Sequence, residues 1–255
     1  MAIFFEESDE LTQAILQDPG KPLVLCEGDS WFALPMRINV VRQIDRMGNY
    51  NILNVATNGD EVISIMSGRE KKLLRRYLRD SFYRFKALLF SGGGNDIVGE
   101  DLVPLLKNKT AANTWRDCIH DERFGRRVEQ IRHAYLDLLD IRDDHRPACP
   151  IVVHGYDYPI ATGVGYLGAG PWIKPYMEQK GIVSSADQNA ILNFLIDRFN
   201  EMLAELAATR PGFVHIATAG TLQPGEWGDE LHPTTQGFRK IAEKIKPELD
   251  RVLQW

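Results

Sequence analysis

The chain has 255 residues, of which 44% are hydrophobic and 25% charged, and its net charge at pH 7 is −5. These values are typical of a globular protein with one substantial core, and the negative charge argues against nucleic acid as the main partner. No apolar run is as long as a membrane span, and the first ten residues are acidic where a secretory signal needs a basic flank. We therefore expect a cytoplasmic protein without a membrane span. We expect a single domain over residues 1–255.

Five short apolar runs alternate with amphipathic segments, and each run stops at small or polar residues. The expected strands cover residues 23–26, 52–55, 86–90, 151–155 and 213–216. The expected helices cover residues 8–20, about 38–47, a stretch within 69–86, about 128 to 146, 185 to about 203, and about 238–245. Strands that alternate with helices indicate a parallel sheet covered on both faces. We predict a three-layer α/β/α sandwich with a central parallel five-stranded sheet.

Two long segments, at about residues 97–124 and 156–183, have little periodicity and exceed the usual length of a connection. Both follow predicted strands, so we expect them to lie as loops over one edge of the sheet. Ser185 fits a capping box that begins the helix after the second segment. Pro247 is expected to kink the last helix or to restart it as a final turn.

Residues 69–86 hold eight Lys or Arg residues and two acidic residues, a local net charge of +6. Apolar residues at helical spacing interrupt the charges, so the basic side chains are expected to form the solvated face of an amphipathic helix. Docking of an anionic surface or substrate is the alternative that we keep for this helix.

Residues that could take part in catalysis follow the predicted strands. Ser30 follows the first strand, Gly59 the second, Asn95 the third, and Asp229 and His232 the fifth. In a parallel sheet these strand ends share one edge, where ligands bind. A serine nucleophile needs a histidine base and an acid that orients this base. Acyl transfer also needs donors to the oxyanion, which the Ser30 and Gly59 N–H groups and the Asn95 amide could supply.

Four sequence blocks resemble the SGNH, or GDSL, hydrolase family, which is named for Ser, Gly, Asn and His. They occur in the order of the family and read Gly28-Asp29-Ser30, Asn54 to Gly59, Gly93-Gly94-Asn95-Asp96, and Asp229-Glu230-Leu231-His232-Pro233. The match runs from about residue 22 to 245, and Trp31 and Phe32 follow the serine where many members have an aliphatic residue. The sequence has no Gly-x-Ser-x-Gly, which argues against the nucleophile elbow of the α/β-hydrolases.

The resemblance implies an SGNH fold and a serine esterase or acylhydrolase that cleaves a small-molecule ester through an acyl-enzyme. Ser30, Asp229 and His232 would be catalytic, and Ser30, Gly59 and Asn95 would form the oxyanion hole. We expect no metal and no organic cofactor. Carbohydrate O-deacetylation and thioester hydrolysis by the same triad are the alternatives within this chemistry. A non-catalytic binding module that docks through the basic helix is the alternative of another class.

Trp31 after the first strand, His154 at the end of the fourth strand and four aromatic residues of the second long segment could line a substrate pocket. The candidates are Trp31, His154, Tyr156, Tyr158, Tyr166 and Trp172. A satellite hydrophobic cluster under a loop is the competing interpretation for the tyrosines and Trp172. A hydrogen-bonded structural histidine is the competing interpretation for His154.

Overall fold

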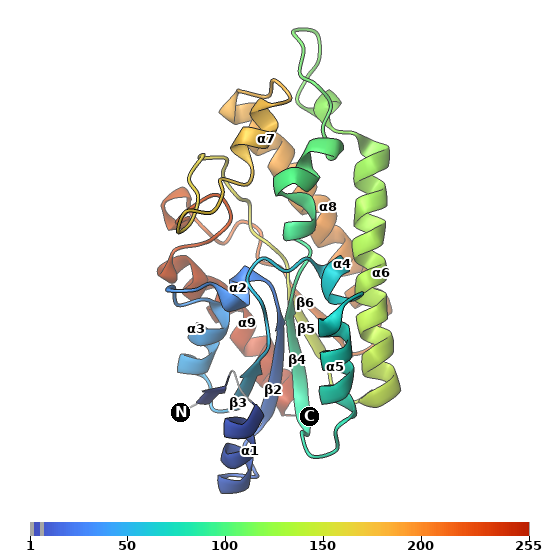
Figure 1. Cartoon of the computed structure of the whole chain (residues 1–255), viewed down its shortest axis with the longest axis vertical. Coiled ribbons are helices and arrows are strands. Elements are labelled where there is room, and N and C mark those ends of the chain that lie inside the picture. Colours follow the sequence, from blue (N-terminus) through green and yellow to red (C-terminus); the bar gives the residue numbers. More distant parts are fainter. Residues whose placement is uncertain (1–2, 6–7, 255) are drawn as a thin grey trace.

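The computed structural model describes residues 3–5 and 8–254. These residues form one parallel sheet in the order β1-β3-β2-β4-β5-β6 (Figure 1). The strands are β1 (Ile3–Phe5), β2 (Leu23–Gly28), β3 (Asn51–Asn54), β4 (Phe85–Ser91), β5 (Ile151–His154) and β6 (Phe213–Ile216). The five-stranded parallel sheet predicted from the sequence is confirmed as β2 to β6. β1 is an additional short edge strand that pairs with β3.

Helices cover both faces of the sheet, as the predicted sandwich requires (Figure 1). The helices are α1 (Ser8–Gln17), α2 (Ser30–Ala33), α3 (Val40–Met47), α4 (Val62–Ile65), α5 (Arg69–Arg79), α6 (Asp121–His145), α7 (Lys174–Glu178), α8 (Ser185–Thr209) and α9 (Thr235–Leu253). α3 packs against α9 in one layer, and α5 and α8 both pack against α6 in the other. β2 is buried along its whole length because it is central and covered on both sides. None of the helices in the described residues is both long and apolar enough to cross a membrane.

The structure corrects several boundaries. Ser184, not Ser185, is the N-cap of α8, and its side chain accepts the Asp187 N–H. α9 continues through Pro247 instead of restarting there. The two long segments are partly helical: 3₁₀ turns at Gly99–Leu105 and Arg116–Cys118 and the start of α6 lie in the first, and α7 lies in the second.

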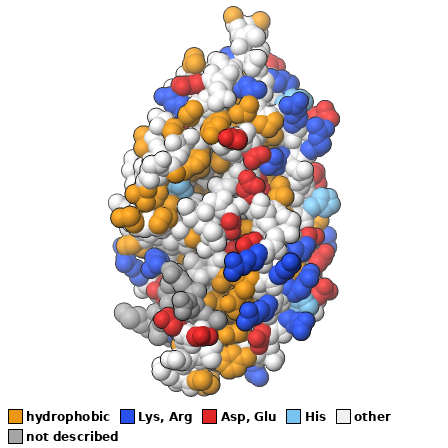
Figure 2. Space-filling model, viewed as in Figure 1, with side chains coloured by type: hydrophobic (Ala, Val, Ile, Leu, Met, Phe, Trp, Pro, Cys, Tyr) orange, Lys and Arg blue, Asp and Glu red, His pale blue; other side chains and the backbone are white. Residues whose placement is uncertain are grey.

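The basic stretch forms an amphipathic helix, α5. Leu74, Tyr77 and Leu78 are buried, whereas Arg75 and Arg76 are exposed. Figure 2 shows basic and acidic side chains intermingled over the face where α5 and α6 lie. Lys71 forms an ion pair with Asp137 of α6, with 2.5 Å between Nζ and Oδ2. The basic charges therefore form the solvated side of this layer.

One carboxyl group, that of Glu27, lies in the core near the end of β2. Glu27 of β2 is fully buried, and its Oε1 accepts the Gly28 N–H at 2.8 Å. Its Oε2 has no hydrogen-bond partner among the described residues. Burial, with the charges of Asp60 and Glu70 adding to it, raises the pKa of Glu27 from 4.5 to about 8. The folded protein therefore keeps this group protonated at neutral pH.

We predict that Glu27 makes the protein less stable as pH rises from about 4.5 to about 8. In this window the unfolded chain has lost the proton that the folded chain keeps, so the free energy of unfolding falls by up to about 1.4 kcal/mol per pH unit. Urea unfolding at pH 5 and pH 8 should show a smaller fall for Glu27→Gln than for the wild type. The exposed Glu100→Gln is the control. Parallel pH profiles of Glu27→Gln and the wild type would contradict the prediction.

Candidate active site

Ser30 lies at the point where β2 turns into α2. Asp29 is the N-cap of this helix, and its Oδ1 accepts the Trp31 N–H at 3.0 Å. Ser30 is the first residue of α2, so its N–H is one of the amides that a helix leaves without an intrahelical acceptor. A Cβ atom on Gly28 would lie only 2.2 Å from the Ser91 carbonyl oxygen. Glycine at this position therefore lets β2 and β4 approach closely just before the turn.

A chain of two hydrogen bonds connects Ser30 to Asp229. The Ser30 Oγ lies 2.9 Å from Nε2 of His232, and Nδ1 of His232 lies 2.8 Å from Oδ1 of Asp229. The carboxylate fixes the tautomer, because Nδ1 must donate to it and Nε2 is then free to accept the serine proton. All three side chains are nearly or fully buried. The structure thus brings together three residues predicted from separate parts of the sequence.

Asp229 is held in the ionised form. Burial by itself would raise its pKa, but the hydrogen bond and charge of His232 and the N–H groups of Leu231 and His232 together lower it. These two N–H groups lie 2.9 and 2.8 Å from Oδ1. Arg37 adds a longer ion pair, with 3.5 Å between Nη1 and Oδ2. An anionic group opposite Nδ1 is what a histidine base requires when it becomes charged.

The structure places Asn95 and Gly59 differently relative to the cavity at Ser30. Asn95 and Ser30 line the same small cavity. The Asn95 amide donates to the Asp60 carbonyl oxygen at 2.9 Å, which orients the group and leaves its second N–H available. Gly59 is exposed in the turn after β3, with φ +89°, and does not line this cavity. The role of its N–H as an oxyanion donor stays a prediction.

The small cavity next to Ser30 has a volume of about 30 Å³. Of the predicted substrate-binding residues, Trp31 and Tyr156 line it. The Trp31 indole N–H donates to the Leu231 carbonyl oxygen at 3.1 Å, and the Tyr156 hydroxyl donates to Asp29. Both rings are thus held in place by hydrogen bonds at their polar ends.

Tyr166 and Trp172 lie on the other side of the site, next to His232. Their ring centroids are 5.7 and 5.4 Å from that of His232. The Tyr166 hydroxyl donates to the Pro35 carbonyl oxygen at 2.6 Å, which ties the second long segment to the residues after α2. These two rings therefore border His232, the candidate base.

Tyr158 and His154 are placed away from the cavity. The Tyr158 hydroxyl donates to Asp197 at 2.7 Å. His154 is fully buried, stacks on Trp31 with ring centroids 5.2 Å apart, and does not line the cavity. Burial lowers its pKa and favours the neutral ring. Neither side chain lines the cavity, and the burial and stacking of His154 favour a structural role for it. Contact of these two side chains with substrate stays a prediction.

Two functional residues were missed by the sequence analysis, Glu230 and Arg37. Glu230 is fully buried and accepts four backbone N–H groups of the second long segment at 2.7–3.0 Å. Arg37 donates to the Pro233 carbonyl oxygen at 2.9 Å, and its guanidinium lies 4.5 Å from the centre of the Tyr166 ring. Together they fix the segment that carries Asp229 and His232 against its neighbours. Only the presence of a second acid in Asp229-Glu230-Leu231-His232 could have signalled Glu230.

Asp96, which follows Asn95, has a structural role. Its two carboxylate oxygens accept the N–H groups of Val62 and Ile63 at 2.8 and 3.1 Å, at the start of α4. Burial raises its pKa to about 6. These two hydrogen bonds hold the start of α4 against the turn that carries Asn95.

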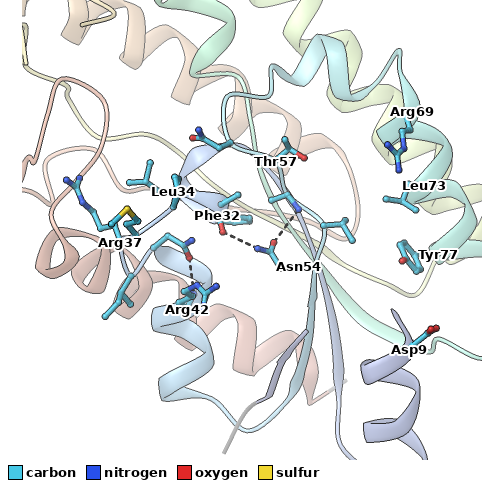
Figure 3. Close-up of a pocket in the computed structure, with 18 residues that line it drawn as sticks. Asp9, Phe32, Leu34, Arg37, Arg42, Asn54, Thr57, Arg69, Leu73 and Tyr77 are labelled. Carbon is cyan, nitrogen blue, oxygen red and sulfur yellow. Dashed lines mark hydrogen bonds between the residues drawn. The ribbon is translucent and has the colours of Figure 1, made fainter. Parts of the chain in front are cut away.

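A larger hollow of about 1100 Å³ lies apart from Ser30, over the end of β3 (Figure 3). Arg37 and Leu34 border it on one side and Arg69, Leu73 and Tyr77 of α5 on the other (Figure 3). Its wall contains neither Ser30 nor His232. In the part of the chain that the structure describes, no three His, Cys, Asp or Glu side chains gather as they would around a metal ion.

We predict that Glu230→Gln loosens the second long segment. The glutamine NH₂ group would face two N–H donors, so two of the four hydrogen bonds would be lost. Hydrogen exchange of residues 163–174, followed by mass spectrometry, should accelerate about 10-fold or more. The exposed Glu178→Gln, in α7 of the same segment, should leave exchange unchanged. Unaltered protection in Glu230→Gln would show that these bonds do not fix the segment.

Comparison with known proteins gives matches in structure but not in sequence. No family model matches the chain, and no curated protein matches it by sequence. The lipase Lip_vut3 from a goat rumen metagenome superimposes with a TM-score of 0.62 at 13% identity, over 89% of this chain and 97% of that one. An extracellular lipase from Streptomyces rimosus gives a TM-score of 0.52 at 16% identity, over 91% and 100%. A candidate SGNH hydrolase from Slackia heliotrinireducens gives 0.52 at 12% identity, over 90% and 100%.

These likenesses extend over most of the chain at low identity, so they concern the fold. Each superposition spans about nine-tenths of this chain, so the chain and these solved structures share their overall architecture. The resemblance noted in the sequence blocks is thereby confirmed at the level of architecture: this chain has the α/β/α fold of the SGNH hydrolases.

Proposed function

We propose that this protein is a serine hydrolase of the SGNH type that cleaves carboxylic esters through an acyl-enzyme on Ser30. The observation that carries the proposal is the hydrogen-bonded chain from Ser30 through His232 to Asp229, with Asn95 at the same cavity. A hydroxyl on a sharp turn, a base within 3 Å and an ionised carboxylate behind it form the constellation that activates serine in hydrolases on unrelated folds. The fold shared with lipases supports the same class.

The geometry supports a two-step acyl transfer. Ser30 Oγ attacks the ester carbonyl carbon while its proton passes to Nε2 of His232. The tetrahedral intermediate collapses when His232 returns this proton to the alcohol oxygen, and the C–O bond to the alcohol breaks. Water then repeats the sequence on the acyl-enzyme, with His232 again as base, and releases the acid. Asp229 remains ionised and stabilises the imidazolium in both steps.

Two donors support the negative charge on the carbonyl oxygen. One is the Ser30 N–H at the start of α2, and the other is the second N–H of the Asn95 amide. Both are held before the reaction begins, Ser30 by the Asp29 cap and Asn95 by the Asp60 carbonyl oxygen. Such preorganised donors stabilise the transition state without reorganisation.

We predict that a fluorophosphonate probe labels Ser30 of the purified protein at neutral pH. Ser30→Ala should give no adduct, and His232→Ala should react about 10³-fold more slowly, because the hydroxyl then lacks its base. Peptide mass spectrometry locates the adduct. The exposed Ser64→Ala is the control and should react like the wild type. Absence of an adduct on folded protein would refute the proposal and favour a binding module that docks through α5.

We predict that Asn95→Ala lowers kcat on an ester by about 10²–10³-fold and changes KM little, since it removes a donor to the oxyanion. Asn108→Ala, at an exposed position, is the matched control. Initial rates over a range of p-nitrophenyl acetate concentrations give both constants. A kcat within a few-fold of the wild type would remove Asn95 from the oxyanion hole.

A further inference from the structure

The cavity beside Ser30 is small and open to solvent on part of its surface. Its wall contains Ser30 and Asn95 together with mainly apolar or aromatic residues. The apolar and aromatic residues are Trp31, Val98, Tyr156, Pro159, Ile196, Trp227 and Leu231. Gly94 and the carboxylates of Asp29 and Asp157 also line the cavity, and both carboxylates accept hydrogen bonds from other parts of the chain. A volume of about 30 Å³ holds roughly two or three water-sized groups, since one such group needs about 10–15 Å³. This space fits two or three carbon atoms.

The cavity accepts the acyl part of an ester and not the alcohol part. The alcohol oxygen must lie within reach of Nε2 of His232, because His232 returns the proton to it. The described residues that line the cavity include Ser30 and Asn95 but not His232. His232 instead faces the rings of Tyr166 and Trp172. An ester with its carbonyl carbon at Ser30 therefore places its alcohol toward these rings and its acyl chain in the cavity.

Tyr156 is a fixed part of the wall. Its hydroxyl donates to the buried Asp29, and Asn200 forms hydrogen bonds with its backbone N–H and C=O at 3.1 and 3.0 Å. Its ring packs directly against the backbone of Gly94, since a Cβ at that position would lie 3.1 Å from the ring. The tyrosine is thus held from three directions, and a longer chain cannot displace it by a rotamer change.

Trp31 is fixed in the same manner. Its indole N–H donates to the Leu231 carbonyl oxygen, and its ring stacks on His154 and meets Phe238 edge-on at 5.8 Å. Both aromatic walls are therefore buried in the core and do not open to solvent. The length of the cavity is set by packing and not by a mobile loop.

We propose that this protein is selective for short acyl groups and hydrolyses acetyl and propionyl esters. The inference rests on the proposed function and names its substrate class. In a rigid pocket, each methylene group that does not fit lowers kcat/KM by about 10-fold or more. A medium-length or long acyl chain is excluded by the same walls that hold Ser30 in place.

A series of p-nitrophenyl esters with 2, 4 and 8 acyl carbons tests the inference, because only the acyl group differs within it. We expect kcat/KM for the acetate to exceed that for the octanoate by about 100-fold or more. Labelling of Ser30 by the fluorophosphonate probe is measured in parallel on the same preparation.

A substitution in the cavity wall should widen the specificity. Ile196→Ala removes part of a wall residue on α8 and should raise the rate on the butanoate relative to the acetate by about 10-fold. Ile191→Ala is the matched control, because Ile191 is buried on the same helix and does not line the cavity. Ile196→Val, a smaller change, gives the same direction of effect should the alanine variant fail to fold.

The outcomes separate the inference from the proposed function. An octanoate hydrolysed as fast as the acetate by a labelled enzyme overturns the inference and leaves the proposed function intact. Labelling of Ser30 combined with no preference for the acetate over the longer esters also overturns the inference and leaves the proposed function intact. An equal shift of specificity in Ile191→Ala and Ile196→Ala also overturns it. Absence of both labelling and hydrolysis refutes the proposed function, and with it the inference.

Discussion

The arrangement of the site depends on the hydrogen bonds that the buried carboxylate of Asp29 accepts. This carboxylate caps the helix that begins at Ser30, and it accepts hydrogen bonds from the hydroxyls of Ser91 and Tyr156. These partners lie at the ends of β4 and just beyond β5, so one side chain joins the ends of three neighbouring strands. A buried carboxyl group is costly unless its oxygens are hydrogen-bonded, and here the donors belong to the elements that form the cavity. The position of Ser30 and the shape of the space beside it therefore have a common cause.

The adjacent residues Asp229 and Glu230 have different roles because different hydrogen-bond donors surround their carboxylates. Asp229 faces the histidine and receives two N–H groups of its own turn. Glu230 points the other way, and its oxygens are occupied by four amides of the segment between β5 and α8. The oxygens of both residues accept hydrogen bonds, and of the two only Asp229 is hydrogen-bonded to the catalytic-base candidate His232. The segment between β5 and α8 is thus ordered by the residue next to the acid of the site.

The sequence predicts the strands and the central residues of the site because both depend on local patterns. A continuous apolar run such as Leu23–Cys26 is typical of a buried parallel strand, and the carboxyl ends of parallel strands meet at one edge. Ser30, Asn95 and His232 were therefore expected to lie together, and they do.

The sequence could not predict the side-chain partners that depend on tertiary packing. The sequence of the second long segment does not distinguish an aromatic residue that faces the cavity, such as Tyr156, from one that binds elsewhere, such as Tyr158, which donates to Asp197. Nothing in the sequence around Arg37 indicates its role, because its hydrogen-bond partners are nearly 200 residues away. Two successive serines, Ser184 and Ser185, stand at the start of α8, and only the backbone shows that Ser184 is the cap.

The distance in sequence between Ser30 and His232 has a consequence for folding. Their hydrogen bond joins residues 202 positions apart, and all strands from β3 to β6 lie between them. Each parallel pairing requires a long crossover, so contacts of this kind form slowly and late. The hydrogen bond between the serine and the histidine therefore depends on contacts that span almost the whole sheet, and it forms only when the loop after β6 has reached the end of β2.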